Sequence, residues 1–471
     1  MEHAAQPSID ARRGRRELGL SSWWMQWLCL LSAAPWLLFP ELRTPYGWIG
    51  VVLLVAQQAV RLLDAEERRR RLDIDVAWPM VGIAAMAVVG LLVSPNYHAS
   101  LPKFLGIVFD IGVYAAIVSA LRTTRLGPGR ADRLWVALAA YAVLGVLVAT
   151  VAFLLTQPAL STWDPVVAFY EARPELPMEA KRFLAQVGLG NPHPNRVADV
   201  LTLFLPCYLA LLLYRPWHGG GEHGVSRDDG RLRRLVRSRW LRVGCSLALA
   251  WVGLVFLVTL SRAAYVGMAI GVVYLLAYRW PRVRLGLCLA ALGAVMLLGL
   301  LLACWLVFGP SESSLPSEAI KVAAQERTLG RTASASGSFA WRLELWPMVV
   351  ELIVRHPWTG IGLNSLIPYI EDRHNAQHAH NLALQAALDL GLPGLACLLA
   401  ILTIALGSSF RALRELRGTS HQAIAVGIVG ALLAFLVATL ADTFPLGSKA
   451  GVFFWMLLGL AVCLPRPHQT S

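Results

Sequence analysis

The chain has 471 residues, of which 56% are hydrophobic and 15% are charged, and its formal net charge is +13. Its mean hydropathy of +0.56 is too high for one soluble core, which excludes an ordinary soluble domain and indicates an integral membrane protein. The positive charge gives no support to a nucleic-acid partner, because it is concentrated in short connections between apolar segments.

Apolar segments recur along the whole chain, and about twelve of them are long enough to cross a hydrocarbon layer of roughly 30 Å as helices. The sequence therefore predicts an all-α membrane protein with about twelve transmembrane helices. The predicted spans are approximately 21–40, 46–63, 75–94, 103–121, 134–156, 197–214, 243–260, 264–278, 285–308, 384–408, 423–441 and 450–465.

Arginines alternate between the connections, as the positive-inside rule requires of cytoplasmic loops. They lie in the N-terminus and in 68–71, 122–133, 231–242, 279–284, 411–417 and 466, whereas intervening loops such as SPNYHASLPK hold few. Both termini are therefore expected in the cytoplasm. Two outward connections are long, at 157–196 and 309–383, and the predicted organisation is nine spans in 1–308, a large outward loop in 309–383, and three spans in 384–471.

The large loop has two parts of different composition. Residues 310–337 are polar and rich in serine, whereas FAWRLELWPMVVELIVRHPWTGIGLNSL has the pattern of an ordered helix lying on the bilayer surface. Its charged face holds Glu344, Glu351 and Arg355, and its apolar face holds Leu345, Trp346, Val349 and Ile353. Because proline fits best in a first turn, Pro347 predicts that this helix begins near Leu343.

Three arginines are expected at the outward side. Arg262 lies in VTLSRAAYVGM, and because an arginine at the centre of a span costs about 2.5–3.5 kcal/mol, a tight turn at Ser261–Ala264 is predicted. Arg196 opens the span at 197–214, and Arg342 lies on the apolar side of the loop helix. A guanidinium suits a phosphate anion. Snorkelling at the interface is the alternative for Arg262, and an ordinary boundary charge for Arg196.

The stretch EDRHNAQHAHNLALQ contains three histidines. The i, i+4 spacing of His374 and His378 is compatible with metal binding, but the segment lacks the glutamate of a zinc-protease motif, so no metal is expected. His374 is expected to be only solvated, and the role of His378 is left open. His380 lies at the mouth of the span at 384–408, where a neutral imidazole can take a proton from an alcohol.

Asn381 or Asp389 would orient His380, and the predicted topology brings His380 to the same side of the membrane as the three arginines. A cationic pocket beside a base suits a lipid-linked diphosphate whose sugar is transferred to a hydroxyl group. GIGLNS, from Gly360, is read as a turn, and no Gly-rich loop with GK[ST] is present, so no ATP or other cofactor is expected.

Four motifs in this order resemble the O-antigen ligase and polymerase superfamily of bacterial membrane enzymes. They are NPHPN before Arg196, TLSRAAY around Arg262, AWRLELWPMVVELIVRHPWTGIGLNSL, and HAHNLALQAALDLGLPGL. The resemblance implies a GT-C-like fold with a large periplasmic loop, a bacterial inner-membrane location, and a donor glycan linked to undecaprenyl diphosphate. It also implies metal-independent transfer without a cofactor.

The resemblance assigns roles by position. His380 matches the essential motif histidine, Arg262 and Arg342 match the arginines that hold the diphosphate, and Arg196 is a further match. Asp389 stands where the family pattern has glutamate. The expected function is an O-antigen ligase with lipid A–core as acceptor. The alternatives are an O-antigen polymerase, a protein O-oligosaccharyltransferase, and, from another class, a transporter or flippase.

A transporter or flippase would be expected to have interrupted spans or ionisable residues deep in the membrane. Asp110, in the span at 103–121, is the only obvious ionisable candidate in the sequence, and a structural role between helices explains it equally well.

Overall fold

The computed structural model describes residues 52, 56, 76–122, 130–155, 194–214, 239–259, 261–280, 282, 286, 337–370, 378–417, 421–441, 446–448 and 451–464. The chain divides into two compact units. The main unit comprises Met1–Val272 and Val349–Ser471, and the second unit is Val273–Met348. Within these described ranges the regular structure is helical, as the sequence predicts.

The helices follow the predicted spans closely. They are α6 (Ala77–Leu92), α7 (Tyr97–Arg122), α8 (Arg130–Leu155), α11 (Pro194–Thr202), α12 (Leu205–Leu213), α14 (Arg239–Val258), α15 (Arg262–Arg279), α18 (Gly337–Arg355), η3 (Ile367–Tyr369), α19 (Leu382–Glu415), α20 (Gln422–Ala438) and α21 (Gly451–Val462). Nine predicted spans coincide with these helices or helix pairs. The spans predicted at 21–40, 46–63 and 285–308 lie outside the described residues apart from positions 52, 56 and 286.

Five segments of these helices are long and apolar enough to cross a membrane: Tyr97–Leu121, Leu134–Phe153, Asn195–Leu213, Trp240–Val258 and Leu382–Glu415. Three shorter helices, α6, α20 and α21, are also apolar. Large apolar side chains such as Leu92, Leu147 and Leu247 are exposed on the outside of the main unit, as lipid contact requires. The chain is therefore an integral membrane protein, and a total of twelve spans stays a prediction.

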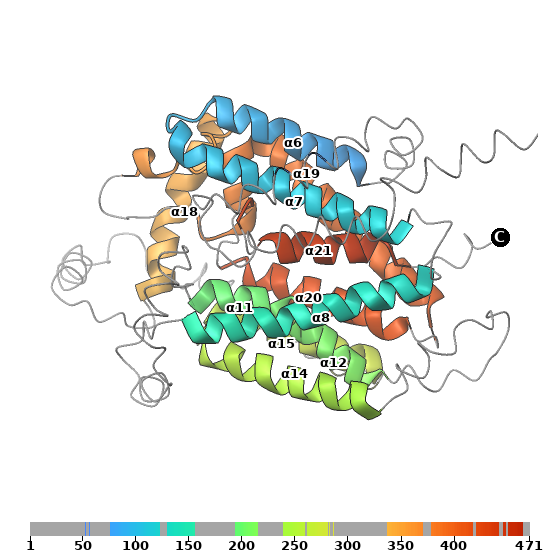
Figure 1. The fold of residues 1–471 in the computed structure, drawn as a ribbon. Helices are drawn as coiled ribbons and strands as arrows, with labels where there is room; N and C mark the ends of the chain where they lie inside the picture. The colour runs from blue at the N-terminus through green and yellow to red at the C-terminus, as the bar shows by residue number, and fades with distance from the viewer. Residues whose placement is uncertain are drawn as a thin grey trace, which may run out of the picture. The chain divides into compact units, whose positions relative to one another are not determined.

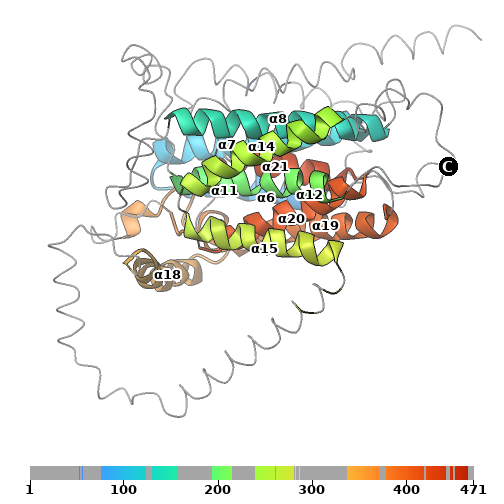
Figure 2. The same cartoon turned by 90° about the horizontal axis from the view of Figure 1, so that it is seen from below.

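The helices of the main unit pack side by side around α20 and α21, whose residues are almost all buried (Figure 1, Figure 2). Helix α19 packs on α6, α12 on α20, and α21 on α7. Backbones approach closely at glycines, since a Cβ at Gly267 would lie 2.2 Å from the Ala434 carbonyl oxygen. Such contacts between small residues are typical of membrane helices, where water supplies no hydrophobic driving force between them.

Two of the predicted spans are interrupted. The segment predicted at 197–214 consists of α11 and α12, with a turn at Leu203–Phe204 between them. Helix α19 contains Gly391 with non-helical φ of 69° and ψ of 178°. A Cβ at Gly391 would lie 2.5 Å from the Trp358 carbonyl oxygen, and the Leu392 amide donates to the Pro357 carbonyl at 2.7 Å. The break in α19 therefore accommodates the segment that follows α18.

Helix α18 begins earlier than the sequence suggests. It starts at Gly337, so Pro347 lies in the helix interior, and the prediction of a start near Leu343 is wrong. Pro347 is on the exposed face, where loss of one backbone hydrogen bond leaves the packed face intact. Of the predicted apolar face, Leu345, Val349 and Ile353 are buried, whereas Trp346 is half-buried.

Candidate functional site

The C-terminal end of α20 is the point where two of the predicted site segments meet. The Leu382 amide donates to the Thr439 carbonyl at 3.0 Å, and the Asn381 side-chain amide donates to the Leu440 carbonyl at 2.9 Å. On another side of α20, Gly267 in α15 touches Ala434 and Ala438, little more than one turn from Arg262. His380 and Arg262 therefore belong to the same end of the main unit.

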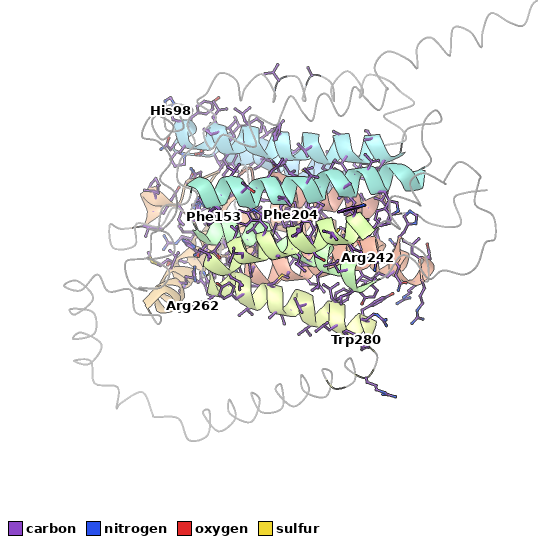
Figure 3. The ribbon with its side chains drawn as sticks, turned by 60° about the horizontal axis from the view of Figure 1, so that its bottom comes forward. His98, Phe153, Phe204, Arg242, Arg262 and Trp280 are labelled. Atoms are coloured by element: carbon purple, nitrogen blue, oxygen red, sulfur yellow. The ribbon has the colours of Figure 1, made fainter. Side chains whose placement is uncertain are left out.

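Arg196 belongs to this end as well. Residues earlier in α12 lie beside residues later in α20. Cys207 and Ala210 lie against Gly427, whereas Pro206 lies beside Gly271 at the level of Gly430. The chain that precedes α12 therefore runs toward the C-terminal end of α20. Helix α11 continues in this direction along α20. Figure 3 shows Arg262 and His98 toward one end of the main unit and Arg242 toward the other.

Arg196 and Arg262 share an unusual local setting. Both are exposed, and each lies in the first turn of a helix, α11 and α15 respectively. The predicted break between two helices is confirmed, but it precedes the predicted Ser261–Ala264: α14 ends at Val258, α15 begins at Arg262, and the Tyr265 amide donates to the Ser261 carbonyl at 3.0 Å. A cationic side chain is unfavourable at the positive end of a helix dipole. An anion bound there would be attracted by both the guanidinium and the positive end of the helix dipole.

Arg342 is half-buried and lies in the second unit, Val273–Met348. Its proximity to Arg196, Arg262 and His380 therefore stays a prediction.

His380 has a strained backbone. It is half-buried, and its φ of 49° lies in the left-handed region, which costs of order 1–3 kcal/mol for a residue other than glycine. Its neighbours fix this conformation. The Ala379 amide donates to Gln385 Oε1 at 2.7 Å, and Asn381 Oδ1 accepts from the Ala383 and Leu384 amides at 3.0 Å each.

The residues that were predicted to support His380 lie in different surroundings in the structure. Asn381 is the N-cap of α19, so its side chain is occupied by the backbone next to His380. His378 is half-buried two residues before His380, and His374 lies outside the described residues. Asp389 is buried two turns into α19 and interacts with other groups that the sequence did not predict.

Asp389 accepts three hydrogen bonds. Its Oδ2 lies 2.5 Å from Lys103 Nζ and 2.9 Å from Gln385 Nε2, and its Oδ1 lies 3.1 Å from the Asn364 amide nitrogen. Lys103 comes from α7 and is buried like its partner, with side-chain relative exposures of 7% for Lys103 and 2% for Asp389. This buried ion pair joins two helices from opposite halves of the chain.

The sequence puts Lys103 at the boundary between the short loop SPNYHASLPK and the span predicted at 103–121, and the structure shows that this boundary lies too late in the chain. Helix α7 starts at Tyr97, after Asn96, whose side chain accepts a hydrogen bond from the Ala99 amide at 3.1 Å. Lys103 therefore lies inside the helix, where Asp389 neutralises it. The i, i+4 spacing of Gln385 and Asp389 puts two polar side chains on one face of an apolar helix, which indicates a buried polar contact there but does not identify Lys103 as the partner.

The turn at Gly360 to Asn364, predicted from GIGLNS, is confirmed and is wedged between α6 and α19. Gly360, Gly362 and Asn364 have φ of 69°, 97° and 53°. The Ile361 amide donates to the Leu388 carbonyl at 2.9 Å, and the Leu363 amide donates to the Gly90 carbonyl at 3.0 Å. These bonds hold the turn against Asp389.

In the parts of the chain that the structure covers, no three histidine, cysteine, aspartate or glutamate side chains gather as metal ligands would. The described cysteines, Cys207, Cys245, Cys397 and Cys463, are free thiols. The residues at this end of the main unit thus offer two exposed guanidinium groups at helix starts and the half-buried imidazoles of His378 and His380. Such a set can bind an anion and move a proton.

Comparison with known proteins agrees with the sequence motifs. Residues 247–399 match the family model Wzy_C, described as O-antigen ligase, and no curated protein matches the chain. The matched range contains Arg262, Arg342, His380 and Asp389, whereas Lys103 and Arg196 lie before it. Residues 247–399, from α14 to the middle of α19, are therefore similar to the Wzy_C family.

Proposed function

We propose that the protein is an O-antigen ligase, which transfers O-antigen polysaccharide from undecaprenyl diphosphate to a hydroxyl group of lipid A–core. The observation that carries this proposal is the Wzy_C match, which includes His380 in its strained turn at the start of α19. A Wzy_C domain implies transfer of a lipid-linked glycan, and the description of the family favours ligation over polymerisation.

The proposed reaction is a single displacement. His380 accepts the proton of the acceptor hydroxyl, and the oxygen attacks the anomeric carbon of the donor sugar. The bond between this carbon and the diphosphate oxygen breaks, undecaprenyl diphosphate leaves, and the anomeric configuration is inverted. Arg262, Arg342 and Arg196 offset the charge that develops on the departing diphosphate, which is electrostatic stabilisation without a metal ion.

The site is proposed to face the periplasm of a bacterium with the protein in the inner membrane. Arg242, in the arginine-rich connection 231–242, lies toward the opposite end of the main unit from Arg262 (Figure 3). Arg411 and Arg414 lie in the last turns of α19, whereas His380 lies just before its start. By the positive-inside rule, the arginine-rich end faces the cytoplasm.

The nearest alternatives differ in the acceptor. An O-antigen polymerase would use a second lipid-linked glycan, and a protein O-oligosaccharyltransferase would use a polypeptide side chain. The proton transfer at His380 is the same in each case, so supplying purified protein with each acceptor in turn separates them.

A transporter or flippase has specific observations in its favour. The α11–α12 interruption and the buried Asp110 and Asp199 are features expected of transport pathways. The prediction that Asp110 is the only such residue is wrong, since Asp199 and the Lys103–Asp389 pair are buried as well. A transporter would not join donor to acceptor in detergent, where no membrane separates two compartments.

The decisive experiment uses purified protein, lipid-linked O-antigen and core lipid, without ATP and with or without a chelator. Transfer is expected in both conditions. His380→Ala is expected to lower the rate about 10²- to 10⁴-fold, the usual contribution of a general base. His98→Ala is the matched control, because His98 is an exposed histidine at the same end of the main unit. Undiminished transfer by His380→Ala would remove the proposed base.

A further inference from the structure

Two residues other than glycine have a positive φ in the described parts of the chain, and hydrogen bonds lead from Asp389 to the backbone at or next to each of them. Asn364 donates its amide to Asp389 directly. His380 is reached through Gln385, which donates to Asp389 and accepts from the amide of Ala379, next to His380. We propose that Lys103, Asp389 and Gln385 form a positioning relay that holds His380 in its reactive conformation. The relay rests on the proposed function only in taking His380 as the base.

Beside the charged Lys103, Asp389 acts only as a hydrogen-bond acceptor. Three donors point at the Asp389 oxygens, which is the arrangement a carboxylate satisfies and a carboxamide does not. Lys103 compensates the carboxylate in a place from which water is excluded, and the two are 2.5 Å apart. Lys103 thus acts on His380 through Asp389 without touching it.

The side-chain amide of Gln385 links Asp389 to the backbone next to His380. Because its Nε2 is turned toward Asp389, its Oε1 faces the Ala379 amide at 2.7 Å. If position 389 carried an asparagine with its NH₂ group toward Gln385, the glutamine would have to rotate. Its own NH₂ group would then face the Ala379 amide, and the bond that fixes the backbone before His380 would be lost.

The other carboxylate oxygen of Asp389, Oδ1, holds the turn that follows α18. The Asn364 amide donates to Oδ1, and the Asn364 side chain donates to the Ala99 carbonyl at 3.3 Å. Ser100 Oγ donates to the Leu363 carbonyl at 2.5 Å. One carboxylate therefore fixes two strained turns relative to each other and to α7. This arrangement exceeds what packing two helices requires.

A double variant at Lys103 and Asp389 distinguishes a role in positioning His380 from a role in stability alone. Lys103→Met and Asp389→Asn, each alone, are expected to lower the melting temperature in detergent, because each leaves a buried partner unmatched. Combined, they leave no unpaired charge, so the melting temperature is expected to recover toward wild type. With the asparagine oxygen accepting from the Asn364 amide, its NH₂ group faces Gln385 and the glutamine is rotated, so kcat is expected to stay reduced about 10- to 100-fold with little change in KM.

Hydrogen–deuterium exchange of the segment 378–384 gives a readout that is independent of activity. Exchange is expected to remain faster than wild type in the double variant, since the Ala379 amide has lost its acceptor. Recovery of kcat and exchange together with the melting temperature would show that the pair serves only the fold, and would overturn the relay.

Gln385→Leu tests the middle of the relay while keeping the ion pair. It is expected to lower kcat about 10- to 100-fold and to speed exchange in 378–384. Ser409→Ala, at another buried polar position of α19 with its hydroxyl bonded to the Ala405 carbonyl at 2.9 Å, is the matched control and is expected to change neither.

The two readouts distinguish the two proposals. If wild-type protein transfers no lipid-linked glycan but Gln385→Leu speeds exchange, the proposed function fails and the structural link to His380 stands without a catalytic role. If wild type is active and Gln385→Leu leaves kcat and exchange unchanged, the relay is wrong and the proposed function is unaffected.

Discussion

Lys103 and Asp110 lie seven residues apart on α7, two turns along the same face, and each makes a buried polar contact of a different kind. Lys103 pairs with Asp389 at 2.5 Å. Asp110 accepts a hydrogen bond from the Gly447 amide at 3.1 Å, and in the described part of the chain no cation is paired with it. The first contact joins charges on two helices, and the second joins a helix to the turn before α21.

The difference separates buried polar groups that lead to the proposed site from those that only hold the helices together. The Asp389 contact leads, within one or two hydrogen bonds, to both strained residues, Asn364 and His380. The Asp110 contact leads to Gly447, which packs so closely on α7 that a Cβ at Gly106 would lie 1.9 Å from its carbonyl oxygen. We therefore expect that a substitution that breaks the Asp389 contact lowers the rate of glycan transfer. A substitution that breaks the Asp110 contact is expected to lower only the stability.

Lys103→Met is expected to have the largest effect on stability. Its methyl thioether fills much of the space of the lysine stem but leaves the Asp389 carboxylate buried without its cation, which costs about 3–5 kcal/mol. The free energy of unfolding in detergent is the measurement. A loss below about 1 kcal/mol would mean that the ion pair contributes no more than an ordinary hydrogen bond, and the contrast with Asp110 would disappear.

Gly360→Ala sharpens the comparison by moving the turn without removing a polar group. Gly360 has a φ of 69°, and a Cβ there would lie 2.4 Å from the Leu388 carbonyl oxygen and 2.9 Å from the Asp389 carbonyl carbon. We expect a loss of about 1–3 kcal/mol from backbone strain, together with a lower rate of glycan transfer. Melting and transfer assays on the same preparation measure both. Unchanged transfer despite the lower stability would dissociate this turn from the site.

Much of this arrangement was accessible from sequence because it depends on local signals. The turn before Arg262 follows from the cost of burying an arginine in a long apolar run, and the start of α19 follows from His380 and Asn381 preceding another such run. Apolar length likewise located the described helices of the main unit, although α7 begins at Tyr97, before its predicted span, and α19 continues to Glu415, beyond its predicted span.

The Lys103–Asp389 pair could not be found in this way. Lys103 follows Pro102 at the edge of a polar loop, which is a normal place for a lysine at a membrane boundary. Its partner is 286 residues away, so only the packing of α7 near α19 reveals that the two charges meet. The positive φ of His380 likewise has no signal in its immediate sequence.

Asp110→Asn is expected to have a modest effect. The asparagine keeps an oxygen that can accept from the Gly447 amide, and no matching cation of the described residues is left unpaired. We expect a change of about 1 kcal/mol, the size of one hydrogen bond, and unaltered transfer. Stability and activity measured beside Lys103→Met make the comparison direct, and a loss of transfer without a loss of stability would give Asp110 a functional role.

Tyr208→Phe is expected to have the smallest effect and supplies a reference for buried polar contacts that only join helices. The Tyr208 hydroxyl donates to the Ala142 carbonyl and thereby ties α12 to α8, while its ring is buried. Phenylalanine keeps the packing and loses one hydrogen bond, so we expect about 0.5–1.5 kcal/mol of destabilisation and no change in transfer. Slower transfer by this variant would show that general loosening of the helices lowers activity. The effects of Gly360→Ala and Lys103→Met would then no longer single out the Asp389 contact.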